Sequence, residues 1–191
     1  MGSDGPTEEV KITQTEEEHN PFTDHPSQYH VMVSEREKNA KLMRVLRSTN
    51  SNRAVVLVWS NRRAMALSEV LRELKFDSRS MYSVEGSHPD SESDGSIQAV
   101  VQSFGPEAGI LVALAEARAL TSDTIRPNLL INYDMPDDAE SYLGRVGPKG
   151  HVSLNGVVIS FAASSDAAVL LEIQEEMPVN IVASPPSSAP A

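Results

Sequence analysis

Two kinds of hydrophobic pattern alternate along this chain. Runs of apolar residues that are rich in valine and isoleucine have the length of buried strands, and between them apolar residues recur every three or four positions, as on one face of a helix. Strands are predicted at residues 29–33, 54–59, 78–82, 109–114, 129–131 and 156–161, and helices at 37–47, 62–74, 97–104, 138–146 and 165–177. This alternation predicts an α/β fold in which helices cover both faces of a parallel sheet.

Polar residues next to these segments predict where two of the helices begin. Asn61 is expected to cap helix 62–74, because an asparagine side chain accepts a hydrogen bond from a free backbone amide. Asp137 and Asp138 place carboxylates at the start of helix 138–146, where the helix dipole favours negative charge.

The two ends of the chain differ in composition from its middle. Residues 1–27 carry seven acidic residues and one basic residue without apolar periodicity, which is typical of a disordered tail. Residues 182–191 are a second tail, rich in proline, serine and alanine. The span 28–181 between them is long enough for one domain with its own core.

Composition narrows the classes of function. The first thirty residues are polar and no apolar run reaches eighteen residues, so we expect neither a signal peptide nor a membrane span, and a nuclear or cytoplasmic location. The chain has no cysteine, and its five histidines lack the spacing of metal ligands, so no bound metal is expected.

Charge is distributed unevenly around a net charge of −11. Residues 28–76 carry ten basic and four acidic residues, a net charge of +6, whereas residues 96–177 have a net charge of −7. A basic segment of this kind suits RNA or an acidic protein segment. A solvated helix face is the simpler explanation in a chain that is acidic overall.

The stretch NYDMPDDAESYLGRVGPKGH, residues 132–151, joins a strand end, a helix and a glycine-rich loop. It resembles the segment of DEAD-box RNA helicases that runs from the "INYDLP" strand into the motif "YIHRIGRxGR" of their second RecA-like domain. The segments AVVLVWSNRRAMALSEVLRELKF and QYHVMVSEREKNAKLMRVL are similar to earlier parts of that domain, especially in the branch that serves mRNA splicing and export. The resemblance covers residues 28–181 and implies a RecA-like helicase C-terminal domain.

The chain departs from the family pattern at positions that the resemblance assigns to the nucleotide cleft. Gly144 stands where the family has histidine, and Pro148 and His151 stand where it has the two arginines that reach the γ-phosphate of ATP. Proline has no donor, and histidine is mostly neutral at pH 7. A second family loop, which contacts RNA and the ATP ribose, keeps an arginine at Arg118 but has Asp123 displaced by two positions. Arg145 fits the motif.

These departures lead to a functional prediction. No GxxxxGK[ST] phosphate loop occurs in the sequence, so we predict that the isolated chain binds no nucleotide cofactor and is not an enzyme. The predicted role is a non-catalytic, helicase-like scaffold for protein partners in RNA processing, export or silencing. The alternative is the C-terminal half of an ATP-dependent RNA helicase whose first domain is supplied elsewhere in the chain or by a partner, and Arg118 and Arg145 would then be its remaining cleft residues.

The same prediction names a surface for the partner. Basic residues gather on helix 37–47 and at the start of helix 62–74, and they suit a protein with an acidic segment. Direct RNA binding through residues 36–63 is expected to be weak, because the loop 82–96 is acidic where the family contacts RNA. The predicted surface comprises Lys38, Lys41, Arg44, Arg62 and Arg63.

Overall fold

The computed structural model describes most of the predicted domain. The described residues are 26–49, 53–81, 109–115, 125, 127–146, 152, 156–176 and 182–183. The predictions for the acidic loop 82–96 and for helix 97–104 lie outside these residues, as do those for all but the inner ends of the two tails.

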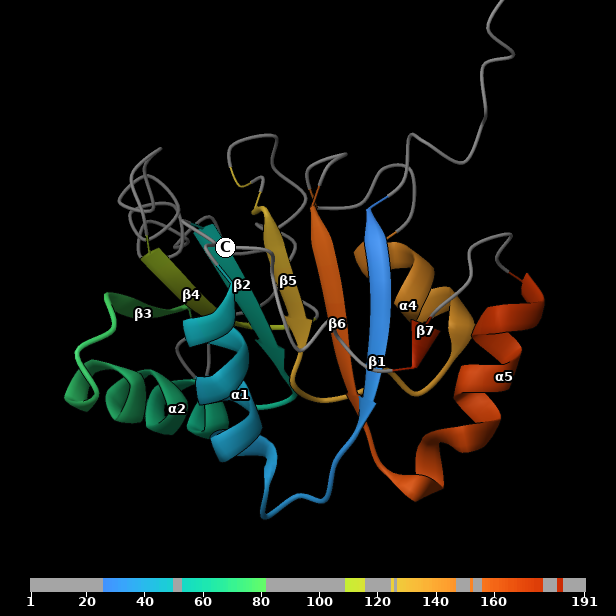
Figure 1. Cartoon of the computed structure of the whole chain (residues 1–191), viewed down its shortest axis with the longest axis horizontal. Helices are drawn as coiled ribbons and strands as arrows, with labels where there is room; N and C mark the ends of the chain where they lie inside the picture. Colours follow the sequence, from blue (N-terminus) through green and yellow to red (C-terminus); the bar gives the residue numbers. More distant parts are fainter. Residues whose placement is uncertain are drawn as a thin grey trace, which may run out of the picture.

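Within the described residues, a seven-stranded sheet forms the centre of the domain (Figure 1). The strand order is β3-β4-β2-β5-β6-β1-β7, and all neighbours are parallel. This confirms the predicted parallel sheet and places the carboxyl ends of all strands on one side, where α/β folds bind their ligands. The strands are β1 (Ser27–Met32), β2 (Arg53–Val58), β3 (Ser78–Met81), β4 (Gly109–Leu114), β5 (Leu129–Asn132), β6 (Val157–Ala162) and β7 (Val182–Ala183).

Helices cover both faces of the sheet, as the hydrophobic pattern predicts. Of the described helices, two pack on each face, and a short 3-10 helix, η2, comes directly before the last of them. Figure 1 shows their arrangement around the sheet. None of the described helices combines the length and the apolar character that a bilayer span requires. The helices are α1 (Lys38–Ser48) and α2 (Asn61–Glu73) on one face, and α4 (Ala139–Val146) and α5 (Ala167–Glu176), with η2 (Ser164–Asp166), on the other.

Strand β2 shows why the central strands are apolar at every position. Val56 points into the core under α1 and α2, whereas Leu57 points into the core under α4 and α5. Both side chains are at most 1% exposed, so each face of the strand needs apolar residues. Burying a side chain of this size contributes roughly 1.5–3 kcal/mol relative to leaving it in water.

The structure corrects the predicted cap of α2. Ser60, with an extended backbone (φ −141°, ψ 148°), is the N-cap, and its hydroxyl accepts a hydrogen bond from the Arg63 amide at 3.2 Å. Asn61 is already the first helical residue, so its side chain does not occupy the cap position. The predicted carboxylate at the start of α4 is confirmed, since Asp138 Oδ1 accepts from the Ser141 amide at 2.6 Å.

One short strand lies where no strand is predicted. Val182 and Ala183 were expected in the tail, but they form β7 beside Tyr29 and His30 of β1. Two residues make too short a pattern to be read as a strand from sequence, because only the neighbouring strand determines whether they pair.

A residue with left-handed backbone follows helix α2. Lys75 has φ +67°, and the amides of Lys75 and Phe76 donate to the carbonyls of Arg72 and Leu71, each at 3.0 Å. This is the Schellman arrangement, in which glycine is the usual residue at the left-handed position. Phe76 packs against the same core that contains Leu71.

Candidate functional site at the carboxyl ends of the strands

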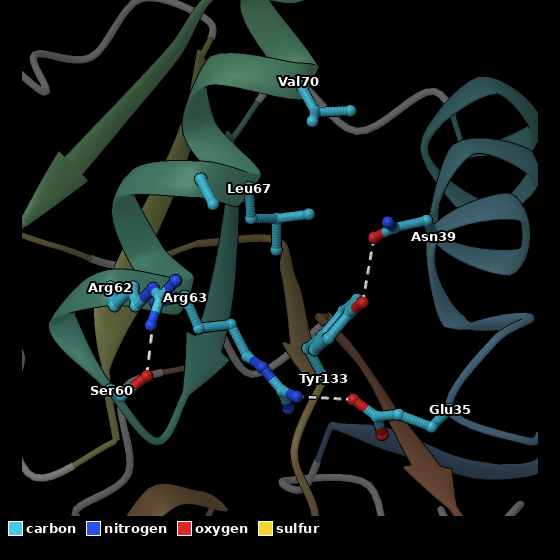
Figure 2. Close-up of a pocket in the computed structure, with 9 residues that line it drawn as sticks. Glu35, Asn39, Ser60, Arg62, Arg63, Leu67, Val70 and Tyr133 are labelled. Atoms are coloured by element: carbon cyan, nitrogen blue, oxygen red, sulfur yellow. Dashed lines mark hydrogen bonds and ion pairs between the residues drawn. The ribbon is translucent and has the colours of Figure 1, made fainter.

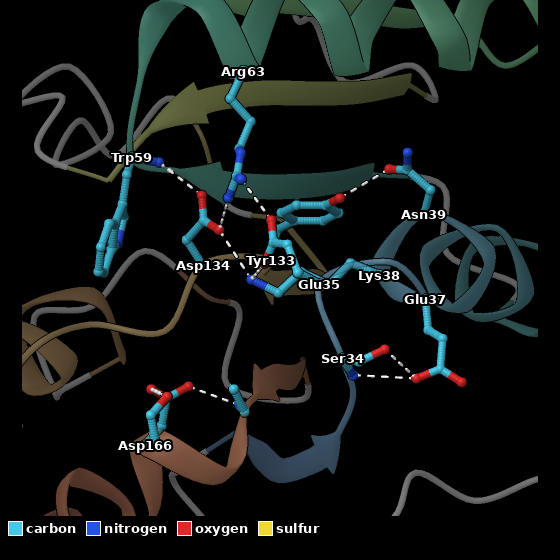
Figure 3. A network of polar contacts seen from close by, with 12 residues as sticks. Ser34, Glu35, Glu37, Lys38, Asn39, Trp59, Arg63, Tyr133, Asp134 and Asp166 are labelled. Carbon is cyan, nitrogen blue, oxygen red and sulfur yellow. Dashed lines mark hydrogen bonds and ion pairs between the residues drawn. The ribbon is translucent and has the colours of Figure 1, made fainter.

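Asp134 is the centre of a polar network where β5 ends. Its carboxylate, whose side chain is 4% exposed, accepts hydrogen bonds from Lys38 Nζ at 3.1 Å, from the Trp59 amide at 3.0 Å and from the Arg63 guanidinium (Figure 3). The Asp134 amide donates to the Leu57 carbonyl at 3.3 Å. One carboxylate therefore ties together the turn after β5, the end of β2, and helices α1 and α2.

A second carboxylate completes this network. Glu35 accepts from Lys38 at 2.8 Å and from Arg63 at 2.5 Å, but its side chain is 58% exposed. The hydrogen bond from Lys38 lowers the pKa of Glu35, which burial opposes and the charges of Lys38 and Arg63 support. We call these four residues, Glu35, Lys38, Arg63 and Asp134, the Asp134 network. Two negative and two positive side chains balance one another within it.

Tyr133 lies beside the Asp134 network. Lys38 Nζ and Arg63 Cζ lie 5.3 Å and 5.8 Å from the centre of its ring, within the range of cation–π attraction. Its hydroxyl donates to Asn39 Oδ1 at 2.9 Å. Burial, supported by the negative charge of Glu35, raises the pKa of Tyr133 to about 12, so the phenol stays protonated at neutral pH.

A pocket of about 430 Å³ opens between α1 and α2 above Tyr133 (Figure 2). Its wall on α2 is largely apolar, and its end near the carboxyl ends of the strands is charged. We call it the α1–α2 groove. The residues that line it are Glu35, Asn39, Ser60, Arg62, Arg63, Ala66, Leu67, Val70 and Tyr133.

A buried polar chain lies on the other side of β5. Arg145 Nη1 donates to Asn132 Oδ1 at 3.0 Å and to the Asp134 carbonyl at 3.1 Å, and Asn132 Nδ2 donates to Ser160 Oγ at 3.0 Å. Arg145 is 8% exposed, and Asn132 and Ser160 are fully buried. These hydrogen bonds fasten α4 to β5 and β6, because each buried polar group needs a partner.

The structure brings together few of the predicted cleft residues. Arg145, which the resemblance assigned to the nucleotide cleft, directs its guanidinium to two acceptors at the end of β5. Gly144 is exposed on α4, with open space where a side chain would begin. Arg118, Asp123, Pro148 and His151 lie outside the described residues.

The predicted basic surface is not one continuous face. Lys38 is 7% exposed and is held by Asp134 and Glu35, so its place on an exposed surface was predicted wrongly. Helical geometry puts Lys41 and Arg44 on the flank of α1 opposite Asn39, which lines the α1–α2 groove. The remaining two residues of the predicted set, Arg62 and Arg63, do line that groove.

Sequence reasoning missed Glu35, Tyr133 and Asp134 as site residues. The segment Asn-Tyr-Asp was interpreted only as a turn that ends a strand. Its position directly after a buried strand was the available signal, since polar residues there lie at the ligand-binding side of a parallel sheet. No sequence signal pairs Asp134 with Lys38, which lies 96 residues earlier. Among the described residues, no group of three histidine or acidic side chains is arranged to hold a metal.

No family model matches the chain, but comparison with the sequences of known proteins identifies its family. DEAD-box ATP-dependent RNA helicase 15 of Arabidopsis thaliana is 35% identical over 155 residues, which cover 81% of this chain and 35% of the relative. ATP-dependent RNA helicase uap56 of Schizosaccharomyces pombe is 36% identical over 83% of this chain and 35% of its own length. The chain belongs to the DEAD-box RNA helicase family.

Solved structures locate this DEAD-box chain within the helicase architecture. The C-terminal domain of the DEAD-box protein Dbp5 aligns with a TM-score of 0.64 at 18% identity, over 84% of this chain and 90% of that one. Escherichia coli SrmB, solved in complex with regulator of ribonuclease activity A, aligns with a TM-score of 0.63 at 22% identity, over 87% and 98%. The predicted fold, a RecA-like helicase C-terminal domain, is confirmed.

The comparisons also overturn one prediction. The missing phosphate loop, together with Pro148 and His151, predicts that the isolated chain is not an enzyme, but its relatives are named as ATP-dependent RNA helicases, which are enzymes. This DEAD-box chain spans about a third of the length of those relatives.

Proposed function

We propose that the chain serves as the second RecA-like half of an ATP-dependent RNA helicase and works with a first RecA-like domain, either in the same polypeptide or as a separate protein. The observation that carries this proposal is the 35% identity to DEAD-box helicases over 81% of the chain, on a RecA-like C-terminal fold. ATP and RNA are then the substrates of the paired domains. A role in RNA processing or export in the nucleus belongs to the same proposal.

In such a pair of domains, the site would form one side of the cleft, with its polar groups held in place by hydrogen bonds. The Asp134 network joins the β1–α1 loop, α2 and the turn after β5. The hydrogen bond from Arg145 to the Asp134 carbonyl fastens α4 on the opposite face of the sheet. A cleft that closes on ATP and RNA needs groups held in place on each side, because small displacements of contacting groups cost large factors in rate. In this proposal, the two networks set that geometry for the second half.

Partner binding is a further part of the proposal. SrmB forms a complex with another protein, and the same is expected for this chain, with a partner that carries an acidic segment.

A reconstituted helicase tests the proposed function. The first RecA-like domain of the S. pombe uap56 relative is joined to this chain, and phosphate release from ATP is measured with and without single-stranded RNA. We expect RNA to raise the ATPase rate of the fusion above that of the first domain alone. The relative's own C-terminal half is the positive control, and the first domain joined to an unrelated domain is the negative control.

The ATPase rate of the fusion distinguishes this function from a domain that does not support ATP hydrolysis. A fusion whose rate equals that of the negative control, with RNA and without it, would refute the proposed function. Circular dichroism and urea unfolding of this chain alone, before fusion, test whether it is folded, so that an inactive fusion of a folded chain is informative.

A further inference from the structure

We propose that the α1–α2 groove is a docking site for a partner peptide that carries one acidic side chain next to an apolar one. The groove lies between two helices that are separated by the pocket rather than packed against each other (Figure 2). Its volume of about 430 Å³ lies near the lower end of the range of small ligand sites, roughly 300–1,000 Å³, and holds a few side chains. Such a groove between helices is a recurring way to bind peptides.

The wall on α2 provides the apolar contact. Ala66 and Val70 lie four positions apart on the flank of α2 that faces α1, and Leu67, which is 4% exposed, forms the floor beside them. Ala66 is exposed and Val70 is partly exposed, so an apolar side chain placed here removes apolar surface from water. This wall favours a peptide over a purely ionic ligand.

The charged end of the groove provides the polar contact. Arg62 is exposed at the groove and has no ion pair with the described residues, whereas Arg63 is already engaged by Glu35 and Asp134. The five charged side chains Glu35, Lys38, Arg62, Arg63 and Asp134 therefore leave one positive charge in excess. One carboxylate of a partner matches that excess.

Glu35 argues against RNA in this groove. Its carboxylate is 58% exposed and lines the groove, so a phosphate backbone lying along the groove would bring negative charge next to it. An apolar wall also offers nothing to a phosphate backbone, whose binding depends on many cations. A single acidic residue approaches Arg62 without bringing further negative charge to Glu35.

The experiment selects peptides on the full chain. A random dodecapeptide library displayed on phage is panned against the protein, and the most enriched peptide is labelled for fluorescence anisotropy. We expect enriched sequences to place aspartate or glutamate within a few positions of leucine, phenylalanine or a similar apolar residue. Replacing that acidic residue by its amide should weaken binding about tenfold or more, since a charged contact is lost.

Variants of the protein locate the site. Arg62→Glu and Ala66→Glu place negative charge at the two ends of the contact and should each weaken the peptide about tenfold or more. Arg44→Glu, on the opposite flank of α1, is the matched control and should change the affinity less than about twofold. All three positions are exposed, so thermal melts should stay close to the parent protein.

Three results would overturn the assignment. The first is panning that enriches no acidic and apolar pairing, or peptides that bind Ala66→Glu as well as the parent. The second is oligouridine RNA that binds with a dependence on Arg62 and displaces the peptide. The third concerns the chain's own acidic residues Glu16, Glu17 and Glu18: if replacing them by lysine in the full chain strengthens peptide binding several-fold, the groove is already used by the chain itself rather than kept for a partner.

Discussion

Replacing Asp134 by asparagine removes the negative charge from the centre of the Asp134 network while keeping the size of the side chain. Lys38, whose side chain is 9% exposed, would keep its positive charge but lose one of its two carboxylate partners. The amide oxygen can still accept from the Trp59 amide, so the change is mainly electrostatic.

The structure sets the expected size of the effect. Removing one partner of a buried ion pair destabilises proteins by about 3–5 kcal/mol, because a charge is left in a poorly solvated place. Glu35 still pairs with Lys38 at 2.8 Å, so we expect the lower end, about 3 kcal/mol. For a chain of this length, that loss corresponds to a decrease of about 6–12 °C in the melting temperature.

Urea unfolding followed by circular dichroism measures the free energy directly. The double variant Asp134→Asn, Lys38→Met also removes the buried cation, and we expect it to recover at least about 1 kcal/mol of the loss. Arg44→Gln, an exposed substitution on the same helix, should change the free energy of unfolding by no more than about 0.5 kcal/mol. An Asp134→Asn protein within about 1 kcal/mol of the parent, or a double variant less stable than the single one, would refute the reasoning.

Three other predictions follow from local geometry. Tyr133 and Tyr142 each have a pKa raised to about 12, chiefly by burial, against 10.0 for a free phenol. They therefore favour folding fully below pH 10, and stability should fall as the pH rises from 10 towards 12. Tyrosinate absorbance should show at least two late-ionising groups, and Tyr133→Phe should remove one of them. Lys75→Gly should raise the free energy of unfolding by about 1 kcal/mol, because glycine adopts the left-handed backbone without a steric penalty, and an unchanged urea midpoint would contradict this. Gly144→Ala should stabilise α4 by about 0.5–1 kcal/mol because the new methyl group meets open space, and a lower melting temperature would show that the space is occupied.

The hydrophobic pattern by itself determined the architecture of this protein. Strand and helix periods placed nearly all the described elements to within a few residues, and the unbroken apolar runs at 54–59 and 109–114 were enough to predict a parallel sheet covered on both faces. The reason is physical: side chains on the same face recur every two residues in a strand and about every 3.6 residues in a helix. Apolar residues at buried positions therefore recur in the sequence with the same spacing. The motif resemblance at residues 132–151 then identified the family.

Tertiary structure alone decided how the polar residues are used. Lys38 looked like a member of an exposed basic face, and it became the buried partner of Asp134 because the end of β5 comes to lie beside the start of α1. Arg145 likewise turns inward, because Asn132 and the Asp134 carbonyl provide acceptors that no local pattern reveals. Charge and hydrogen bonding carry no period along a chain, so a residue's polar partners become known only when distant segments are placed side by side.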